Sequence, residues 1–191
     1  GEDQWIVNNL KLPKKGFFID VGAADGITFS NTYYFEKQGW EGICFEPNPE
    51  NYFLANKFRK NVKEIAISKN NGKAYLEIDP SSPDWSSLVD KKKASNNNSI
   101  IVKTKTLEEV IANNKIKNID LLSIDVEGLE LDVLESFDIL KMPPQIIIVE
   151  FLTKGNKLQE KALINYFSDL PYSLVHQTKA NFIFKFKENN E

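Results

Sequence analysis

The sequence predicts an α/β fold in which a mostly parallel sheet has helices on both faces and ends in a C-terminal antiparallel hairpin. Short apolar runs alternate with helical segments along the chain, and this alternation is typical of parallel sheets. The run from Gln145 to Glu150 is almost wholly apolar, which indicates a central strand covered on both faces. The last two strand-like runs, Tyr172 to His176 and Asn181 to Phe186, are separated by a short polar turn, so they form the hairpin.

Hydrophobic periodicity and turn residues define the other expected elements. The further strands are Gly16 to Val21, Gly42 to Glu46, Lys63 to Ala66, Lys73 to Ile78, Ile100 to Thr104 and Ile119 to Ile124. The helices are Asn31 to Gln38 after Ser30 as N-cap, Pro49 to Arg59, Leu107 to Asn113 after Thr106, a helix with Leu129, Val133, Leu134 and Phe137 on one face, and Leu158 to Phe167. The segment Asp79 to Ser99 is expected to be mainly a loop that carries much of the specificity.

Length and charge limit the classes of protein. The 191 residues fit a single domain over 1–191, which is also compatible with one domain cut from a longer protein. The net charge of −3 gives no general electrostatic reason to bind nucleic acid. No apolar run reaches the roughly 18 residues of a membrane span, and the N-terminal residues lack the basic-then-apolar order of a signal peptide, so we expect a soluble, cytoplasmic protein without membrane insertion. Cys44 is the only cysteine and is expected to pack as a small hydrophobic residue.

The segment Phe17 to Gly26 has the pattern of a nucleotide-cofactor cradle. A buried strand leads into a small-residue turn, where Gly22 and Gly26 let backbone N–H groups approach a ligand closely. The glycines alone are equally compatible with a tight turn that binds nothing. Glu46, at the end of the second apolar strand, favours the cradle because a carboxylate there accepts hydrogen bonds from ribose hydroxyls.

Six motifs together resemble the FkbM-type methyltransferases of the Rossmann-like class I fold, which use S-adenosylmethionine. The resemblance covers about residues 17 to 151 and implies methyl transfer to a hydroxyl group, commonly of a sugar, a glycan or a polyketide-like product. One departure is Ala24, where the broader methyltransferase pattern has a glycine. The motifs are Asp20 to Gly26, Ser30-Asn31-Thr32, Glu46 to Pro49, Ser86-Ser87-Leu88, Thr106-Leu107 and Asp125 to Gly128.

The resemblance implies a cofactor site made of these motifs. Asp20 and Asp25 suit the ammonium and sulfonium charges of S-adenosylmethionine better than a phosphate. Ala66 and Ile67 are expected to flank the adenine, although ordinary core packing explains them equally well. The full expected set is Asp20, Gly22, Ala23, Asp25, Gly26, Ser30, Asn31, Thr32, Glu46, Pro47, Asn48, Ala66, Ile67 and Asp125.

Asp125 follows the strand Ile119 to Ile124, where ligands collect in open α/β sheets, and is the first candidate for the catalytic base. It is alternatively a ligand of magnesium or manganese together with Glu127 and Glu150. Glu127 is grouped with the catalytic residues and Glu150 with the substrate contacts, although a plain strand-end role explains Glu150 equally well. A tight transition-metal site is not expected, since the chain has one histidine and one cysteine.

Three further residues complete the candidate set. Histidine is the side chain suited to proton transfer near neutral pH, so His176 is a second candidate base, against a structural role on the terminal hairpin. Trp85 and Ser86 precede or begin the Ser-Ser-Leu motif and are expected to contact a small-molecule or glycan acceptor. The expected partners are that acceptor and, in a longer protein, fused domains such as a glycosyltransferase.

Two other functions remain open from the sequence. A nicotinamide-dependent oxidoreductase would use a similar first strand and turn, but the chain lacks a full Gly-x-Gly-x-x-Gly motif and a second parallel half. A catalytically inactive methyltransferase-like binding module would keep the fold without the chemistry. The acidic residues at the strand ends favour the S-adenosylmethionine-dependent O-methyltransferase.

Overall fold

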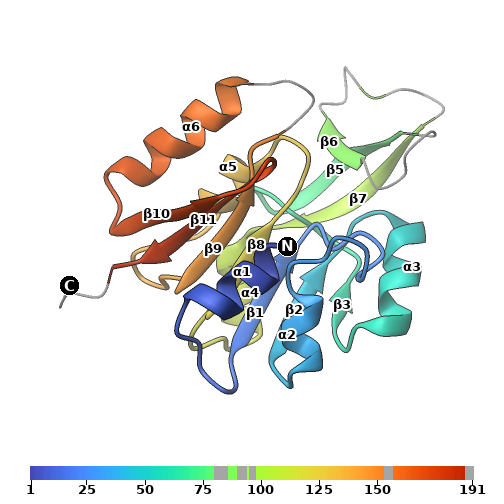
Figure 1. Cartoon of the computed structure of the whole chain (residues 1–191). Helices are drawn as coiled ribbons and strands as arrows, with labels where there is room; N and C mark the ends of the chain where they lie inside the picture. The colour runs from blue at the N-terminus through green and yellow to red at the C-terminus, as the bar shows by residue number, and fades with distance from the viewer. Residues whose placement is uncertain (80–85, 90–93, 95–97, 153–156, 188–191) are drawn as a thin grey trace.

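The computed structural model describes residues 1–79, 86–89, 94, 98–152 and 157–187 (Figure 1). Its main sheet has seven strands in the order β10-β11-β9-β8-β1-β2-β3. The strands from β9 to β3 run parallel, and β11 joins β9 and β10 in antiparallel pairs. The expected parallel sheet with a closing antiparallel hairpin is therefore confirmed.

The elements mostly lie where apolar periodicity places them. The strands are β1 (Phe17–Val21), β2 (Glu41–Phe45), β3 (Val62–Lys63), β4 (Ala66–Ile67), β5 (Gly72–Ile78), β6 (Ser86–Val89), β7 (Ser99–Lys105), β8 (Leu121–Ile124), β9 (Ile146–Glu150), β10 (Tyr172–Gln177) and β11 (Asn181–Phe186). The helices are α1 (Glu2–Asn9), α2 (Tyr33–Lys37), α3 (Pro49–Phe58), α4 (Leu107–Asn113), α5 (Glu130–Leu134) and α6 (Lys157–Ser168).

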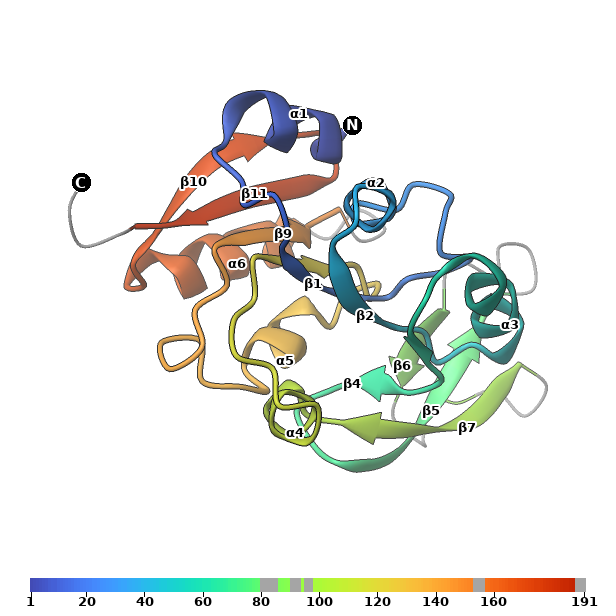
Figure 2. The ribbon, with the colours of Figure 1, turned by 90° about the horizontal axis from the view of Figure 1, so that it is seen from below.

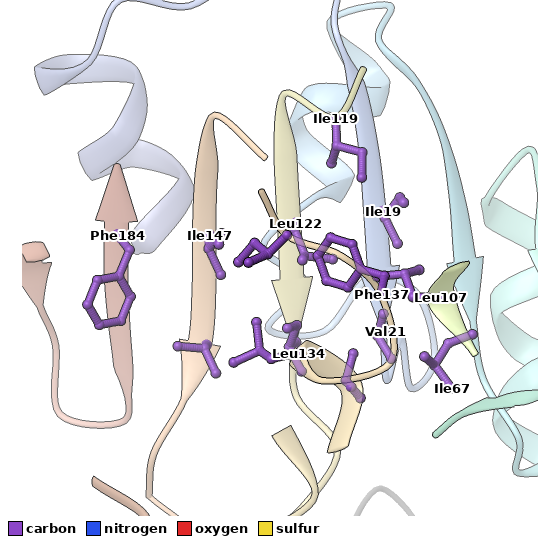
Figure 3. Close-up of a cluster of buried hydrophobic side chains, with 14 of the residues drawn as sticks. Ile19, Val21, Ile67, Leu107, Ile119, Leu122, Leu134, Phe137, Ile147 and Phe184 are labelled. Atoms are coloured by element: carbon purple, nitrogen blue, oxygen red, sulfur yellow. The ribbon is translucent and has the colours of Figure 1, made fainter. Parts of the chain in front are cut away.

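Helices cover both faces of the main sheet because successive strand residues point to opposite sides. Ile19 packs in a core with α4, α5 and α6, whereas its neighbour Phe18 packs in a second core with α1, α2 and α3. Figure 2 shows α1 and α2 on one side of the strands and α4 and α5 on the other. In Figure 3, Ile19, Leu122 and Ile147 project from neighbouring strands into the first core. Cys44 is buried in the second core, as expected.

The structure has a second sheet in addition to the parallel sheet expected from the sequence. The second sheet has the order β4-β7-β5-β6, and its β5 pairs antiparallel with both neighbours. The predicted strand Lys63 to Ala66 is wrong, because the chain divides there into β3 of the main sheet and β4 of the second sheet. The segment containing Ser86 was expected to be loop, but Ser86–Val89 forms the edge strand β6.

The N-terminal helix was also not expected from the sequence. α1 packs against the terminal hairpin, where the Trp5 ring stacks on the His176 imidazole with centroids 4.3 Å apart. Glu2 accepts hydrogen bonds from Thr178 and Asn181 of the same hairpin at 2.8 and 2.9 Å. Helix α2 begins at Tyr33, two residues later than predicted, although Ser30 Oγ still accepts from the Tyr33 N–H at 3.1 Å.

The order of the strands defines where a ligand fits. The chain passes from β1 to β2 on one side and later returns to place β8 on the other side of β1. Such a reversal opens a crevice at the carboxyl ends of the central strands. Among the described helices, none has the length and apolar composition of a membrane span.

Candidate active site

A cavity of about 580 Å³ opens at the carboxyl ends of β1, β2, β8 and β9. This volume lies within the range of small-molecule and cofactor sites, roughly 300–1,000 Å³. Part of the second sheet, including Ala66, Ile67 and Leu76, closes one side. The start of α1 and Ala180 and Asn181 close another. The crevice at the carboxyl ends of the strands is therefore enclosed on two sides and forms a pocket.

The loop from β1 to α2 forms the floor of the cavity. Gly22 has a φ of 85°, and a Cβ placed there would lie 1.7 Å from the carbonyl oxygen of Asp125. The glycine therefore allows the loops after β1 and β8 to touch. Ala24 has a φ of 46°, in the left-handed region that favours glycine, which explains why the broader pattern has a glycine at this position.

Arg59 fixes this loop from behind. The side chain is fully buried and forms ion pairs with Glu36, at 2.6 Å, and Asp20, at 3.3 Å. The guanidinium also donates to the Gly26 carbonyl oxygen at 3.0 Å and to Thr32 Oγ1 at 2.7 Å. Burial raises the pKa of Asp20, while Arg59 and the hydroxyl of Thr32 act to lower it. Sequence reasoning missed Arg59, although it is the only arginine of the chain.

Glu46 extends the cavity wall at the end of β2. One carboxylate oxygen accepts the Ala24 N–H and the other accepts the Asn48 N–H, both at 2.8 Å. Glu46 is only 5% exposed, and both of its carboxylate oxygens accept hydrogen bonds. The orientation of its side chain is therefore fixed before any ligand binds. Asn48 in turn caps α3 by accepting from the Glu50 N–H at 3.1 Å.

Three carboxylates meet at the ends of β8 and β9. One oxygen each from Asp125, Glu127 and Glu150 lies within 4.8 Å of the others. Burial and the neighbouring charges of Asp125 and Glu127 raise the pKa of Glu150. Enclosure by the protein also raises the pKa of Asp125, although its side chain is open to the cavity. Oε2 of Glu150 is buried without a hydrogen-bond partner among the described residues.

Glu130 holds the loop that carries two of these carboxylates. Its Oε1 accepts from the Val126 N–H at 3.2 Å and from the Gly128 N–H at 3.1 Å. Gln159 of α6 donates to its other oxygen, and both side chains are buried. Burial raises the pKa of Glu130, against the hydrogen bonds from the two N–H groups. Glu127 lies within this loop and has a φ of 55°, in the left-handed region, so the chain turns tightly at this residue.

The predicted site residues differ in their position relative to the cavity. The structure brings most of them to the cavity wall: Asp20, Gly22, Ala23, Asp25, Ser30, Asn31, Glu46, Pro47, Ala66, Ile67, Ser86, Asp125, Glu127 and Glu150. Three predicted residues do not line the cavity and instead support its wall. Gly26 accepts a hydrogen bond from Arg59. Thr32 donates to Asp20, and Asn48 donates to Ser86. His176 stacks on Trp5 and does not line the cavity. Trp85 lies outside the described residues.

The cavity is strongly acidic. No lysine, arginine or histidine side chain lines it among the described residues. A cationic ligand is attracted to such a wall, whereas a phosphate is repelled. The acidic lining residues are Glu2, Asp3, Asp20, Asp25, Glu46, Asp125, Glu127 and Glu150.

This geometry defines a class I methyltransferase-like fold, with a crevice at the end of β1 and an acidic residue at the end of β2. The model of the methyltransferase FkbM domain family matches residues 20–181. The chain therefore belongs to the FkbM methyltransferase family. No curated protein matches the sequence.

Solved structures show the same fold. A crystal structure of the methyltransferase FkbM from Methylobacillus flagellatus KT superposes with a TM-score of 0.62 at 15% identity, covering 94% of this chain. This chain spans only 45% of the length of that protein. A ribosomal protein L11 methylase from Lactobacillus delbrueckii subsp. bulgaricus superposes with a TM-score of 0.50 at 10% identity, covering 98% of this chain and 77% of the other. At these identities the likeness concerns the fold alone.

Proposed function

We propose that this domain transfers the methyl group of S-adenosylmethionine to a hydroxyl group of an uncharged acceptor, such as a sugar or a glycan. The observation that carries the proposal is the placement of Glu46 and of the Asp125 carboxylate on the walls of one cavity. Glu46 is held ready for a polar ligand, and Asp125 lies across the crevice at the end of β8. One pocket thus combines a cofactor wall with a candidate base.

The residues present fit S-adenosylmethionine. Glu46 suits the ribose hydroxyls, since a carboxylate accepts hydrogen bonds from two neighbouring hydroxyls. The loop after β1 suits the methionine part, because it lines the cavity between the Asp20 and Asp25 carboxylates, which attract an ammonium group. Ala66 and Ile67 provide an apolar wall for the adenine. The cofactor supplies a methyl group activated by the sulfonium charge, which the acidic lining attracts.

The protein must then align the acceptor and remove its proton. We assign proton removal to Asp125, which is open to the cavity and whose pKa is raised by enclosure. The acceptor oxygen forms a bond to the methyl carbon as the carbon–sulfur bond breaks, and the hydroxyl proton passes to the carboxylate. Glu150 lies beside Asp125 and takes up protons more readily than an isolated glutamate. Its raised pKa of about 10 keeps Glu150 protonated at neutral pH, so the transferred proton goes to Asp125.

A divalent cation is the second way to activate the hydroxyl. Asp125, Glu127 and Glu150 offer one oxygen each within 4.8 Å of one another. Carboxylate oxygens suit magnesium and manganese, which lower the pKa of a bound hydroxyl. Activity with and without magnesium distinguishes the two mechanisms: loss of turnover in a chelator, restored by the cation, assigns the cluster to a metal.

Calorimetry with S-adenosylmethionine, S-adenosylhomocysteine and NAD tests the cofactor. We expect binding of the first two at micromolar Kd and no heat with NAD. Glu46→Ala should weaken binding by about tenfold or more, because it removes charge-assisted hydrogen bonds. Glu41→Ala is the matched control, since Glu41 is exposed at the other end of the same strand. Absence of binding by the wild type would favour an inactive binding module.

A second measurement tests the base. Asp125→Asn should abolish turnover while the Kd for S-adenosylmethionine changes little, because the amide keeps the shape of the side chain but cannot accept the proton. Normal turnover of purified Asp125→Asn would contradict the assignment. A cytoplasmic location, the acceptor as partner and fusion to other domains stay predictions.

A further inference from the structure

Phe29 stands at the mouth of the cavity without a structural reason to be aromatic. It is 98% exposed and yet belongs to the cavity wall. Its ring takes part in none of the aromatic or cation–ring contacts found among the described residues. A single exposed apolar side chain is ordinary in itself. Phe29 differs because of where it lies and how its backbone is held.

The backbone of Phe29 is strained. Its φ is 57°, in the left-handed region, where a bulky side chain is a genuine outlier. Glycine or asparagine would occupy this position at lower cost. Strain of this kind is concentrated at ligand-binding positions, where surrounding contacts maintain it. The combination of a strained backbone and an exposed ring therefore suggests that the ring serves a ligand.

The neighbouring residues hold the loop rigidly on both sides of Phe29. Asp25 accepts hydrogen bonds from the N–H groups of Ile27 and Thr28 at 2.8 and 2.7 Å. The Ser30 N–H donates to the Ile27 carbonyl oxygen at 3.2 Å, and Arg59 donates to Ser30 Oγ at 3.2 Å. The backbone that carries the ring is consequently held at a fixed place on the rim and does not need to be ordered when a ligand arrives.

Two other exposed phenylalanines provide a comparison. Phe53 and Phe58 lie on α3, within a regular helix, and neither lines the cavity of the site. The ammonium group of Lys57 lies 4.1 Å from the centroid of the Phe53 ring. The backbone at Phe53 and at Phe58 is not in the left-handed region. They are suitable controls for general effects of removing an exposed aromatic side chain.

We propose that Phe29 is an acceptor-contact residue, whose ring stacks on the apolar face of an uncharged, hydroxyl-bearing acceptor at the mouth of the cavity. This inference rests on the proposed methyl transfer and deepens it by naming a residue that selects the acceptor. An aromatic platform provides apolar contact area, while the carboxylates deeper in the cavity accept hydrogen bonds from hydroxyls. The same carboxylates repel phosphate or carboxylate groups, so anionic acceptors are excluded.

Steady-state methylation tests the proposal with defined probes. The acceptors are the methyl glycosides of glucose, galactose, mannose and rhamnose, and glucose 6-phosphate and glucuronic acid serve as anionic counterparts. Formation of S-adenosylhomocysteine is the readout. We expect turnover with at least one methyl glycoside and none with the anionic sugars. Phe29→Ala should raise the KM for that glycoside by about fivefold or more, with kcat nearly unchanged.

Matched variants separate stacking from other roles. Phe29→Tyr keeps the ring and should restore the KM to within about twofold of the wild type. Phe53→Ala should change neither KM nor kcat. The Kd for S-adenosylmethionine, measured by calorimetry, should stay unchanged in all three variants. If wild-type protein fails to bind the cofactor, the proposed function fails; if it binds the cofactor but methylates only anionic sugars or none of the glycosides, the present inference fails.

Thermal unfolding adds a readout that does not depend on the acceptor. Phe29→Gly relieves the left-handed strain and removes no buried contact, so its Tm should be unchanged or higher than that of the wild type. A fall of more than about 4 °C would show that Phe29 has a structural role and would overturn the inference. An unchanged KM in Phe29→Ala would overturn it equally, and would indicate that the ring serves another surface contact.

Discussion

The guanidinium of Arg59 lies 3.3 Å from the carboxylate of Asp20, and neither side chain is more than 6% exposed. Arg59 follows α3, whereas Asp20 belongs to β1, so the pair joins a peripheral helix to the central strand of the site. The same guanidinium contacts Gly26 and Thr32, which bracket the loop over the cavity floor. The loop that forms the site is thus anchored by one buried cation.

Replacing Arg59 with methionine should strongly destabilise the protein. The substitution leaves Asp20 and Glu36 buried without their cation, which typically costs about 3–5 kcal/mol. Lys141→Met is the control, since Lys141 is 75% exposed and its contact with Glu108 is 3.7 Å long, so a change below about 1 kcal/mol is expected. Urea unfolding of both variants gives the two free energies. Equal losses of unfolding free energy in the two variants would show that the buried ion pairs of Arg59 stabilise the protein no more than the exposed contact of Lys141 does.

Gly22→Ala should damage the site more than a left-handed backbone alone explains. A Cβ at Gly22 would lie 1.7 Å from the Asp125 carbonyl oxygen, so the two loops must separate. Gly39 has a similar φ of 92°, but a Cβ there meets nothing within 4 Å. Gly39→Ala should therefore cost about 1 kcal/mol, and Gly22→Ala at least about 2 kcal/mol more.

The comparison of Gly22→Ala with Gly39→Ala needs unfolding curves and calorimetry. Only Gly22→Ala should lose affinity for S-adenosylmethionine, because only this glycine lies at the floor of the cavity. If both variants lose the same free energy, the close approach of the two loops does not contribute. If Gly22→Ala keeps full affinity, the loop does not hold the cofactor.

The positions of Glu46 and Asp125 were predictable because local patterns determine them. Each follows a short apolar strand, and the carboxyl ends of parallel strands meet at one edge of a sheet. Arg59 was not predictable in this way. Its partners Asp20 and Glu36 are 39 and 23 residues distant in sequence, and no periodicity connects them. Its status as the only arginine is the one sequence signal that pointed to a special role.

The second sheet was partly hidden from the sequence for a different reason. β6 has only four residues, Ser86–Val89, and each is half-buried, so no apolar run marks it. β4 has two residues, Ala66 and Ile67, which is too short for a periodic signal. α1 buries Ile6 as its single fully buried residue, so its helical pattern is weak. Packing against other elements, rather than local pattern, determines these three segments.

Glu130 should control the position of the loop from Asp125 to Gly128 without touching a ligand. Glu130→Ala removes the acceptor for the Val126 and Gly128 N–H groups and should cost about 2–4 kcal/mol of stability together with most of the turnover. The double variant Glu130→Gln with Gln159→Glu reverses the pair: the new amide oxygen still accepts the N–H groups and its NH₂ donates to the new carboxylate.

The Glu130 reversal distinguishes positioning from general destabilisation. The double variant should recover kcat to within about tenfold of the wild type. Glu130→Gln alone replaces the charge-assisted hydrogen bond from Gln159 with a weaker bond between two neutral amides and should recover less. Turnover and unfolding free energy are measured for the three variants. Recovery of stability without recovery of kcat would mean that the charge of Glu130 itself takes part in the reaction.

Glu150→Gln should change the pH dependence of stability in metal-free protein. Burial and the neighbouring charges of Asp125 and Glu127 raise the pKa of Glu150 above the unfolded value of 4.5. At a pH below that value, the Glu150 carboxyl is protonated in both the folded and the unfolded protein, so it does not change the free energy of unfolding. As the pH rises toward the folded pKa, the unfolded state gains from ionisation that the folded state cannot match, so the wild type loses stability.

Removing this carboxylate should therefore stabilise the protein at pH 8 relative to wild type, with the difference fading toward pH 4. Unfolding in urea with a chelator at a series of pH values measures the effect, and Glu41→Gln on the exposed end of β2 is the control. Adding magnesium at pH 8 gives a second test, because a cation bound to the three carboxylates would offset their repulsion. A wild type that magnesium stabilises and a Glu150→Gln variant that it does not would assign the cluster to a metal. Equal stability of the two proteins at every pH would show that Glu150 is not destabilised by its neighbours.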